Sequence, residues 1–543
     1  MKKKNILLIS FIFIIIFSII VVKPLGNLDE IWNYNTARTI SEGLIPYKEI
    51  SMITTPFLPI ITAIFLKIFT NEILVSRILA ALLWTGILFM MYKILKNLIK
   101  DENASLIFTA LIGILCRDIY CIDYNAVSLF IVLIILYLEL INTEKNNKKD
   151  KENINQINPS NDKINNILKY NKKHEILIGI LVGLTICTKQ SIGAILAIIS
   201  VGYKLLFVRN SEEFKQYLKV SFTRILGILI PGCILLTYLL ISGSFTDFLN
   251  YAVLGIKTFS NKIKYSNLLQ NDKFEIRFLV ILLPISAILI SIELIVNTIK
   301  ESKKSKNTLD NNEQLKLLIL LFYSLSMIIT MYPISDEIHF LVGSLIAFIG
   351  TLYLIFIVCK NNKKNIKLKQ TMQEKTKKKI YKTYIIITDI ICIILFMIIL
   401  KKATTNLYNY TKVEKNKTIK HYKNIEISEG LSNRITQIDN YIIEQEKYGK
   451  KVYIVDAEAA IYMIPLDKYN KNYDMFLKGN IGKDGEEGII NEIKNSKENC
   501  LYLVMKPKYY SNWQTPTKVV NYIKNNLNLI DEITIFNVYE KFK

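Results

Sequence analysis

Two adjacent carboxylates, Asp29 and Glu30, follow the first apolar run of the chain within the stretch Asn27–Tyr47, NLDEIWNYNTARTISEGLIPY. Asn27 can cap a helix, and Glu30 stands three residues later, as in a capping box. Gly43 can end that helix. We therefore expect a surface helix that begins with an acidic pair. The pair can complement the helix dipole, or one carboxylate can accept a proton from a substrate.

Later segments carry further groups that could act with this pair. The segment TTPFLPI, residues 54–60, is expected to begin a second surface helix that ends near Phe69. Arg77 lies near the outer end of the next apolar run, where it either reaches the lipid headgroups or meets a phosphate. The remaining candidates are Asp118 and Asp123 in CRDIYCIDYN, Lys189 and Gln190 in TKQS, and Asp336 and His339 in YPISDEIHF.

Each candidate also has a plainer interpretation. Asp118 and Asp123 can form a solvated turn, and reaching the headgroups is the commoner role for an arginine such as Arg77. A lone histidine such as His339 is more often structural than catalytic. Lys189 is different, because a lysine at a break between two apolar runs is costly unless it meets water or an anion.

The composition predicts a polytopic membrane protein. Of 543 residues, 51% are hydrophobic, and the mean hydropathy of +0.28 is high for a soluble chain of this charge. Apolar runs recur that can cross a hydrocarbon core of ~30 Å, and the first has no small-residue cleavage site, so it is interpreted as a retained span. The expected spans, about eleven, are Ile6–Val22, Ile73–Leu98, Ala104–Cys121, Tyr124–Ile141, Ile176–Cys187, Ile192–Phe207, Ile225–Ile241, Phe278–Val296, Leu317–Met331, Phe340–Val358 and Tyr384–Leu400.

Lysine-rich loops alternate with short acidic loops along the chain. The formal net charge of +23 would suggest nucleic acid in a soluble protein. Here the lysines cluster between apolar runs, so we expect them to orient the spans by the positive-inside rule, with no nucleic acid partner. The expected protein is a multi-pass protein of the cell membrane. Its N-terminus is cytoplasmic, and its acidic loops and C-terminal part are extracytoplasmic.

The chain divides into two expected domains, a membrane domain at 1–400 and an extracytoplasmic α/β domain at 406–543. Within the first, residues 24–72 form the first outer loop. The Asn- and Lys-rich stretch 143–173 is interpreted as a disordered cytoplasmic insertion.

The C-terminal stretch alternates helix and strand signals, which indicates the α/β domain. KKVYIVDAEAAIYMI predicts a strand entering a helix, CLYLVMKP a strand, and TPTKVVNYIKNNLNLIDEITIFNVYEK a helix followed by a strand. The glycine-rich Gly479–Gly488 is not a phosphate-binding P-loop, because no Gly-Lys-Ser/Thr follows. The seven cysteines show no pair spacing, so neither a disulfide framework nor a zinc site is expected.

The order of these features resembles the membrane glycosyltransferases of the C superfamily. The shared features are an N-terminal span, an outer Asp-Glu pair on a surface helix, the sequence GLIPY, a Pro-bearing second stretch, and an arginine at the next span. The chain is most similar to family 39, the protein O-mannosyltransferases and the bacterial relatives that move aminoarabinose onto lipid A. The resemblance covers roughly residues 1–400. The later TKQ and DEIH stretches are similar to those of bacterial members.

The resemblance implies transfer of a hexosyl or pentosyl group from a polyprenyl-phosphate donor to a hydroxyl of a lipid, polymer or protein, with inversion. Asp29 would be the general base, and Glu30 would orient the base or the acceptor. A divalent ion is the one cofactor that the resemblance admits, because metal dependence varies within the superfamily. In the remaining roles, Lys189 and Arg77 would neutralise the lipid phosphate, Asp118 or Asp123 would hold the sugar or an ion, and Gln190, Asp336 and His339 would line the pocket.

Two other classes of function stay open at the level of sequence. A transporter or flippase of a lipid-linked glycan would also use many spans and intramembrane charges. Against it, the candidate residues gather at one face instead of the midplane, and no internal repeat is found. A non-catalytic scaffold would use the C-terminal domain to bind cell-wall polymers or protein.

Overall fold

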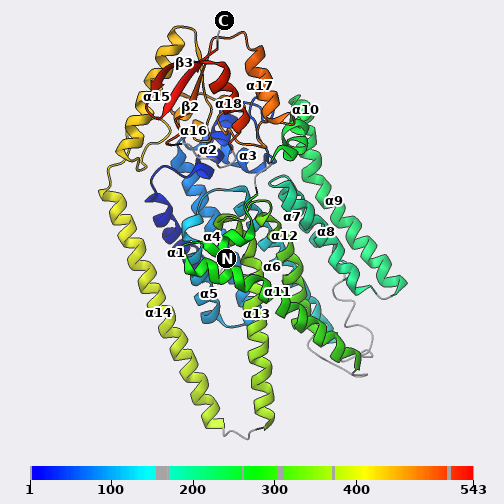
Figure 1. Ribbon diagram of the computed structural model, residues 1–543. Coiled ribbons are helices and arrows are strands. Elements are labelled where there is room, and N and C mark those ends of the chain that lie inside the picture. The colour runs from blue at the N-terminus through cyan, green and yellow to red at the C-terminus, as the bar shows by residue number, and fades with distance from the viewer. Residues whose placement is uncertain are drawn as a thin grey trace.

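The chain forms a helical bundle that is covered at one end by a small α/β domain (Figure 1). The computed structural model describes residues 3–153, 168, 170–208, 210–259, 262–303, 311–369, 374–509 and 515–541. The end of the bundle that carries the α/β domain is called the capped end below.

Each of the eleven expected spans contains or lies on a helix, so the predicted helical polytopic architecture is confirmed. Within the described ranges, eight helical segments are long and apolar enough to cross a membrane: α1, α4, α6, α8 with the turn after it, α9, α11, α12 and α13. The helices are α1 (Lys3–Val21), α4 (Ile73–Ile99), α5 (Glu102–Leu115), α6 (Tyr124–Asn153), α7 (Lys172–Ile186), α8 (Gln190–Gly202), α9 (Ser211–Ile241), α11 (Phe274–Lys303), α12 (Asn311–Ile328), α13 (Glu337–Lys369) and α14 (Glu374–Lys412).

The first loop forms the two expected surface helices, α2 (Leu28–Ser41) and α3 (Phe57–Ile68). The Asn27 side chain accepts a hydrogen bond from the backbone N–H of Glu30 at 3.1 Å, as a capping residue should. The chain leaves α2 through Gly43, whose φ of 104° is one that glycine adopts readily. The capping box is only half formed, because the Glu30 side chain bonds to Arg77 instead of returning to the cap.

The predicted disordered insertion at 143–173 is wrong in its first part. Helix α6 continues to Asn153, and α7 already begins at Lys172. Extending a formed helix costs little compared with nucleating one, so a polar sequence can continue the turn of the apolar span before it. Residues 154–167 and 169 of the insertion lie outside the described residues.

The C-terminal domain is built on a four-stranded mixed sheet of β1 (Lys451–Ile454), β2 (Cys500–Met505), β3 (Asn528–Ile533) and β4 (Phe536–Glu540). The strand order is β1-β2-β4-β3, with β1 parallel to β2 and the other neighbours antiparallel. The expected final strand is therefore two strands, paired as a hairpin. The helices of this domain are α15 (Glu429–Lys447), α16 (Ala459–Met463), α17 (Gly485–Asn495) and α18 (Thr517–Asn526).

The central strand β2 is buried on both faces and separates two cores. Cys500, Tyr502 and Val504 belong to a core that also includes residues of α17 and α18. The other face packs with α15, α16 and, from the first loop, α2. Helix α2 therefore belongs to the C-terminal domain as much as to the bundle. This places its N-terminal end at the junction of the two domains.

Short helical turns after α9 complete the capped end. They are α10 (Phe245–Phe248), Leu249–Leu254, Gly255–Thr258 and Tyr265–Gln270. Tyr251 donates a hydrogen bond to the Asn472 side chain at 2.7 Å, and the backbone N–H of Lys483 donates to Asn250 at 2.8 Å. The C-terminal domain therefore contacts both the first loop and this later segment.

Glycines allow α7 and α9 to pack closely. A Cβ atom on Gly179 would lie 2.2 Å from the Arg224 carbonyl oxygen and 2.8 Å from the Cα of Gly227. Small residues at a helix contact let two backbones approach, which is a main source of association between membrane helices.

Gly179→Ala is expected to force α7 and α9 apart and to lower the free energy of unfolding by about 1–3 kcal/mol, the usual range for overpacking. Thermal unfolding in detergent would measure the change. Gly232→Ala is the matched control, because Gly232 also lies on α9 and a Cβ atom there would meet nothing within 4 Å. Equal melting temperatures for the two variants would contradict the close packing.

Candidate active site

Asp29 stands in the first turn of α2, partly buried at the capped end. Burial raises the pKa of its carboxyl to about 7. The charges of Asp123 and Asp336 raise this pKa further, and that of His339 lowers it. Asp123 comes from the start of α6, and Asp336 and His339 come from the start of α13, so the fold brings these distant segments near Asp29. A carboxylate with this pKa can take up a proton near neutral pH.

Asp336, the residue before α13, forms a pair with His339 in the first turn of that helix. The Asp336 Oδ1 atom lies 2.8 Å from His339 Nδ1 and accepts the backbone N–H of His339 at 2.8 Å. Burial opposes ionisation of Asp336, but the hydrogen bonds and the charge of His339 prevail and lower its pKa. The Asp336 carboxylate therefore stays ionised beside Asp29.

Asp123 caps α6 from the loop after α5. Its side chain accepts the backbone N–H groups of Asn125 at 3.0 Å and Ala126 at 3.3 Å. Only 5% of Asp123 is exposed, and burial raises its pKa despite the charges of Lys189 and His339. These two hydrogen bonds fix the Asp123 carboxyl in place.

Lys189 lies at the break between α7 and α8, where the sequence predicts it. Its Nζ atom donates to the Asn125 side-chain oxygen at 2.6 Å and lies 4.9 Å from the centre of the Tyr124 ring. Burial lowers its pKa to about 8, and the charges of Asp123 and Asp336 act in the opposite direction. Among the described residues, the ammonium group therefore has one neutral hydrogen-bond partner, and donors remain for an anion.

Gln190 supports the cluster from the first residue of α8. Its Nε2 atom donates to the carbonyl oxygens of Ile53 at 2.9 Å and Ala252 at 3.1 Å. These bonds join α8 to the first loop and to the segment after α9. Its Oε1 atom is buried and has no hydrogen-bond partner among the described residues.

Glu30 and Arg77 lie outside this cluster, in a buried ion pair. Arg77 Nε lies 2.8 Å from Glu30 Oε1, and Arg77 Nη2 lies 3.0 Å from Glu30 Oε2. Arg77 Nη1 also donates to the Lys23 carbonyl oxygen at 2.6 Å. Arg77 is thus buried instead of reaching the headgroups, and its donors are engaged by the protein.

Asp118 is also outside the cluster, although Asp123 from the same loop is inside it. Lys273 Nζ lies 2.8 Å from Asp118 Oδ2 and 2.5 Å from Glu337 Oε1. Asp118 is half-exposed in this ion network. The structure therefore separates the two acids that the sequence left as alternatives.

An apolar groove of about 660 Å³ begins next to the cluster and runs between α8, α11, α12 and α13. Ser335, the neighbour of Asp336, lines it at the capped end, and Ala347 and Gly350 line it further along α13. Lys262 and Lys264 also line it and are exposed. A groove of this kind can hold a hydrocarbon chain with a charged end near the cluster.

Four neighbours of the cluster were not identified from the sequence. Asn125 and Tyr124 hold Lys189, and Lys262 and Lys264 line the groove. Asn125 lies in the CRDIYCIDYN stretch, so its position beside Asp123 was a usable signal. The two lysines stand two residues apart in a loop and carry no pattern that distinguishes them from orienting charges.

Sequence comparisons give no match, because neither a protein-family model nor a curated protein corresponds to the chain. Solved structures match at low similarity. ArnT from Cupriavidus metallidurans bound to undecaprenyl phosphate is 10% identical, with a TM-score of 0.49, over 98% of this chain and 97% of ArnT. The Archaeoglobus fulgidus oligosaccharyltransferase in the apo form is 12% identical, with a TM-score of 0.46.

The oligosaccharyltransferase match covers 86% of this chain, and the chain spans 64% of that protein's length. The S. cerevisiae protein O-mannosyltransferase Pmt1-Pmt2 complex bound to the sugar donor is 17% identical, with a TM-score of 0.31, over 48% of this chain and 36% of that one. Identities this low, with TM-scores below 0.5, assign no activity to this chain.

Arg77→Met is expected to lower the free energy of unfolding by about 3–5 kcal/mol, because it leaves the Glu30 carboxylate buried without its partner. The double variant with Glu30→Gln should recover most of this loss, because it removes the buried charge as well. Chemical denaturation in detergent would measure both.

Lys423→Met is the control for this pair. It breaks a 3.8 Å ion pair between the exposed Lys423 side chain and the partly buried Glu72, and should cost no more than about 1 kcal/mol. A loss in Arg77→Met as small as that of the control would show that the buried pair does not hold α2.

Proposed function

We propose that the chain transfers a hexosyl or pentosyl group from a polyprenyl-phosphate donor to an acceptor hydroxyl at the outer face of the cell membrane. One observation carries the proposal. Four separate segments bring Asp29, Asp123, Lys189 and the Asp336–His339 pair to one end of the bundle, next to an apolar groove. An acid–base group, a cation and a hydrocarbon site are the parts that such a reaction needs.

Asp29 is the general base in this proposal. It removes the proton of the acceptor hydroxyl while that oxygen attacks the anomeric carbon and the bond from this carbon to the phosphate oxygen breaks. The electron pair of the broken bond goes to the phosphate. Attack from the face opposite the leaving group inverts the anomeric centre. The raised pKa of Asp29 supports this role, because a base is most effective near the operating pH.

Lys189 is the proposed partner of the leaving phosphate. Its position between Asn125 and Tyr124 holds the ammonium group without neutralising its charge, so it can stabilise the negative charge that develops on the phosphate. The engagement of Arg77 by Glu30 argues against the same role for Arg77. Lys262 and Lys264 add positive charge along the groove in which we place the lipid chain.

The other carboxylates have supporting roles in this proposal. Asp123 is better placed than Asp118 to hold the sugar, because its charge acts on both Asp29 and Lys189. Asp336 and His339 line the pocket. Glu30 orients the base indirectly, because its bond to Arg77 fixes the first turn of α2.

Divalent ions prefer carboxylate ligands such as Asp123 and Asp336. Among the described residues, however, these two do not belong to a group of three whose ligand atoms lie within 4.8 Å of one another. The cluster is therefore not a ready metal site, and each step above is carried by protein side chains.

Asp29→Asn is expected to lower transfer by about 10²-fold or more, because it removes the base and keeps the shape of the side chain. The measurement is transfer from a panel of radiolabelled polyprenyl-phosphate sugars in purified membranes. Asp118→Asn is the matched control and should keep transfer, because Asp118 lies outside the cluster.

Full transfer by Asp29→Asn would refute the proposed base. If no donor in the panel is used by the wild-type protein, vesicle flux of the same labelled lipids would test the transporter alternative. A transporter moves the lipid across the bilayer without forming a glycosidic bond.

The pH dependence of kcat/KM is expected to be bell-shaped. Activity needs ionised Asp29, so it should fall as pH drops below about 7, the pKa of that group. Activity also needs protonated Lys189, so it should fall as pH rises above about 8. Lys189→Arg should move the alkaline limb upward, because arginine does not lose its proton in this range. An unchanged alkaline limb in this variant would assign that limb to another group.

A further inference from the structure

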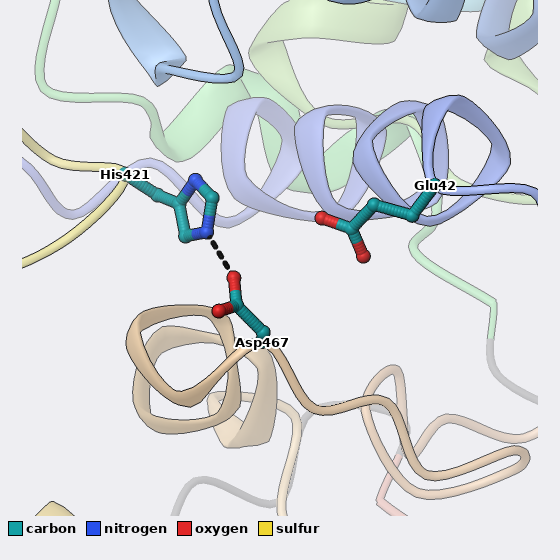
Figure 2. A group of neighbouring side chains, drawn as sticks. All are labelled: Glu42, His421 and Asp467. Carbon is teal, nitrogen blue, oxygen red and sulfur yellow. Dashed lines mark hydrogen bonds and ion pairs between the residues drawn. The ribbon is translucent and has the colours of Figure 1, made fainter.

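A second group of polar side chains lies where the C-terminal end of α2 meets the C-terminal domain. It consists of Glu42, His421 and Asp467, whose nearest ligand-type atoms all lie within 4.8 Å of one another (Figure 2). Glu42 caps the end of α2, His421 lies in the segment before α15, and Asp467 follows the turn Ile464–Leu466. The proposed transfer reaction uses none of the three.

The hydrogen bonds of His421 fix which ring nitrogen carries a proton. His421 is 4% exposed, and its Nδ1 atom lies 2.5 Å from the Asn71 carbonyl oxygen. A carbonyl oxygen can only accept, so Nδ1 must be the donor. In the neutral ring, Nε2 then carries a lone pair. This Nε2 atom lies 2.5 Å from Asp467 Oδ1, which is also an acceptor when ionised.

Two acceptors at this distance need a positive species between or beside them. That species is either a second proton on the ring or a cation bound by both atoms. The bond from Nδ1–H to a backbone carbonyl is the arrangement that orients a metal-binding histidine and fixes its tautomer. The Asn71 carbonyl group lies outside the group of three. With Nδ1 bound there, the Nε2 atom faces Asp467 (Figure 2).

Glu42 is likewise held in position by residues outside the group. Arg38 Nη1 donates to its two carboxylate oxygens at 3.0 and 2.9 Å, and Asn71 Nδ2 donates to its Oε1 atom at 2.8 Å. The Oδ1 atom of the same Asn71 amide is buried without a hydrogen-bond partner among the described residues. This acceptor lies beside the group and could take a hydrogen bond from a metal-bound water.

Among the described residues, two cations bond to the carboxylates of the group, Arg38 to Glu42 and Lys420 to Asp467. Lys420 bonds to Asp467 Oδ2, and its side chain is 55% exposed. An exposed lysine gives up such a pair at little cost, because surface ion pairs contribute about 0–1 kcal/mol. Arg38 can remain on Glu42, since a carboxylate has lone pairs for both partners.

We propose that Glu42, His421 and Asp467 bind one divalent cation that accepts mixed nitrogen and oxygen ligands, with Zn²⁺ as the best fit. One imidazole and two carboxylates, completed by water, suit such an ion better than Ca²⁺ or Mg²⁺, which prefer oxygen ligands alone. Lys420 moves to solvent when the ion binds, and Nε2 and Oδ1 separate to their distances as ligands. The ion joins the C-terminal end of α2 to two segments of the C-terminal domain.

The experiment measures metal binding by the full chain, purified in detergent and stripped with a chelator. The protein is incubated with Zn²⁺, desalted and analysed for bound metal by mass spectrometry. Wild type is expected to retain one ion per chain at this site. Glu42→Gln and His421→Ala should each weaken Zn²⁺ binding by at least about tenfold, as removal of metal-site residues does. Co²⁺ in place of Zn²⁺ should give visible absorption bands that the variants lack.

His339→Ala is the matched control, because it removes a histidine outside the group and should leave this ion bound. Glu42→Gln keeps the size and shape of a partly exposed side chain, so it separates loss of the ion from loss of folding. Retention of the ion by both Glu42→Gln and His421→Ala would overturn the proposal. So would a wild type that retains none, since the group would then be an ion pair of protonated His421 only. No donor or acceptor sugar is present, so failure here is separate from failure of the proposed transferase.

Discussion

The ion pair between Glu30 and Arg77 fixes the surface helix α2 on the bundle. Charges buried in this way cost several kcal/mol each to remove from water, and the bidentate bonds at 2.8 and 3.0 Å offset that cost only while both partners are present. Glu30 is the neighbour of Asp29, so the pair determines the depth and direction of the candidate base. Glu30 lies in the first turn of α2, the helix on which the C-terminal domain packs.

The C-terminal domain holds α2 from the opposite side. Trp32 donates to the Ala457 carbonyl oxygen at 2.9 Å, Asn35 to the buried carboxyl of Asp474 at 3.2 Å, and Arg38 to the Lys468 carbonyl oxygen at 2.9 Å. None of these residues belongs to the cluster around Asp29. The domain therefore acts on the candidate site through the rigidity of α2. Weaker packing of the domain on α2 would first change the position of Asp29.

Local sequence patterns predicted the elements well. The capping signals at Asn27 and Gly43 gave α2, and apolar runs gave the helices of the bundle, because both depend on neighbours close in the chain. The choice between Asp118 and Asp123 depended on Lys273, which is far away in the sequence. The sequence therefore left that choice open.

Two further gaps have the same cause. Arg77 was expected at the headgroups or at a phosphate, but its partner Glu30 lies 47 positions earlier. The group of Glu42, His421 and Asp467 has no motif spacing, because its members come from the first loop and from two places in the last domain. The cysteine spacing, from which no zinc site was expected, carries no information about a group that contains no cysteine.

The packing of α2 against the last domain has a consequence for biosynthesis. Translation produces α2 well before the C-terminal domain that packs on it, since Asn35 and its partner Asp474 lie 439 positions apart. Until the C-terminal domain has been made and has folded, Asn35 and Arg38 lack their partners in it. The nascent chain thus carries an incomplete first loop while the helices between α2 and the C-terminal domain are made. The first loop is therefore completed only after the C-terminal domain is made, and a chain that stops before this domain would lack the partners that hold α2.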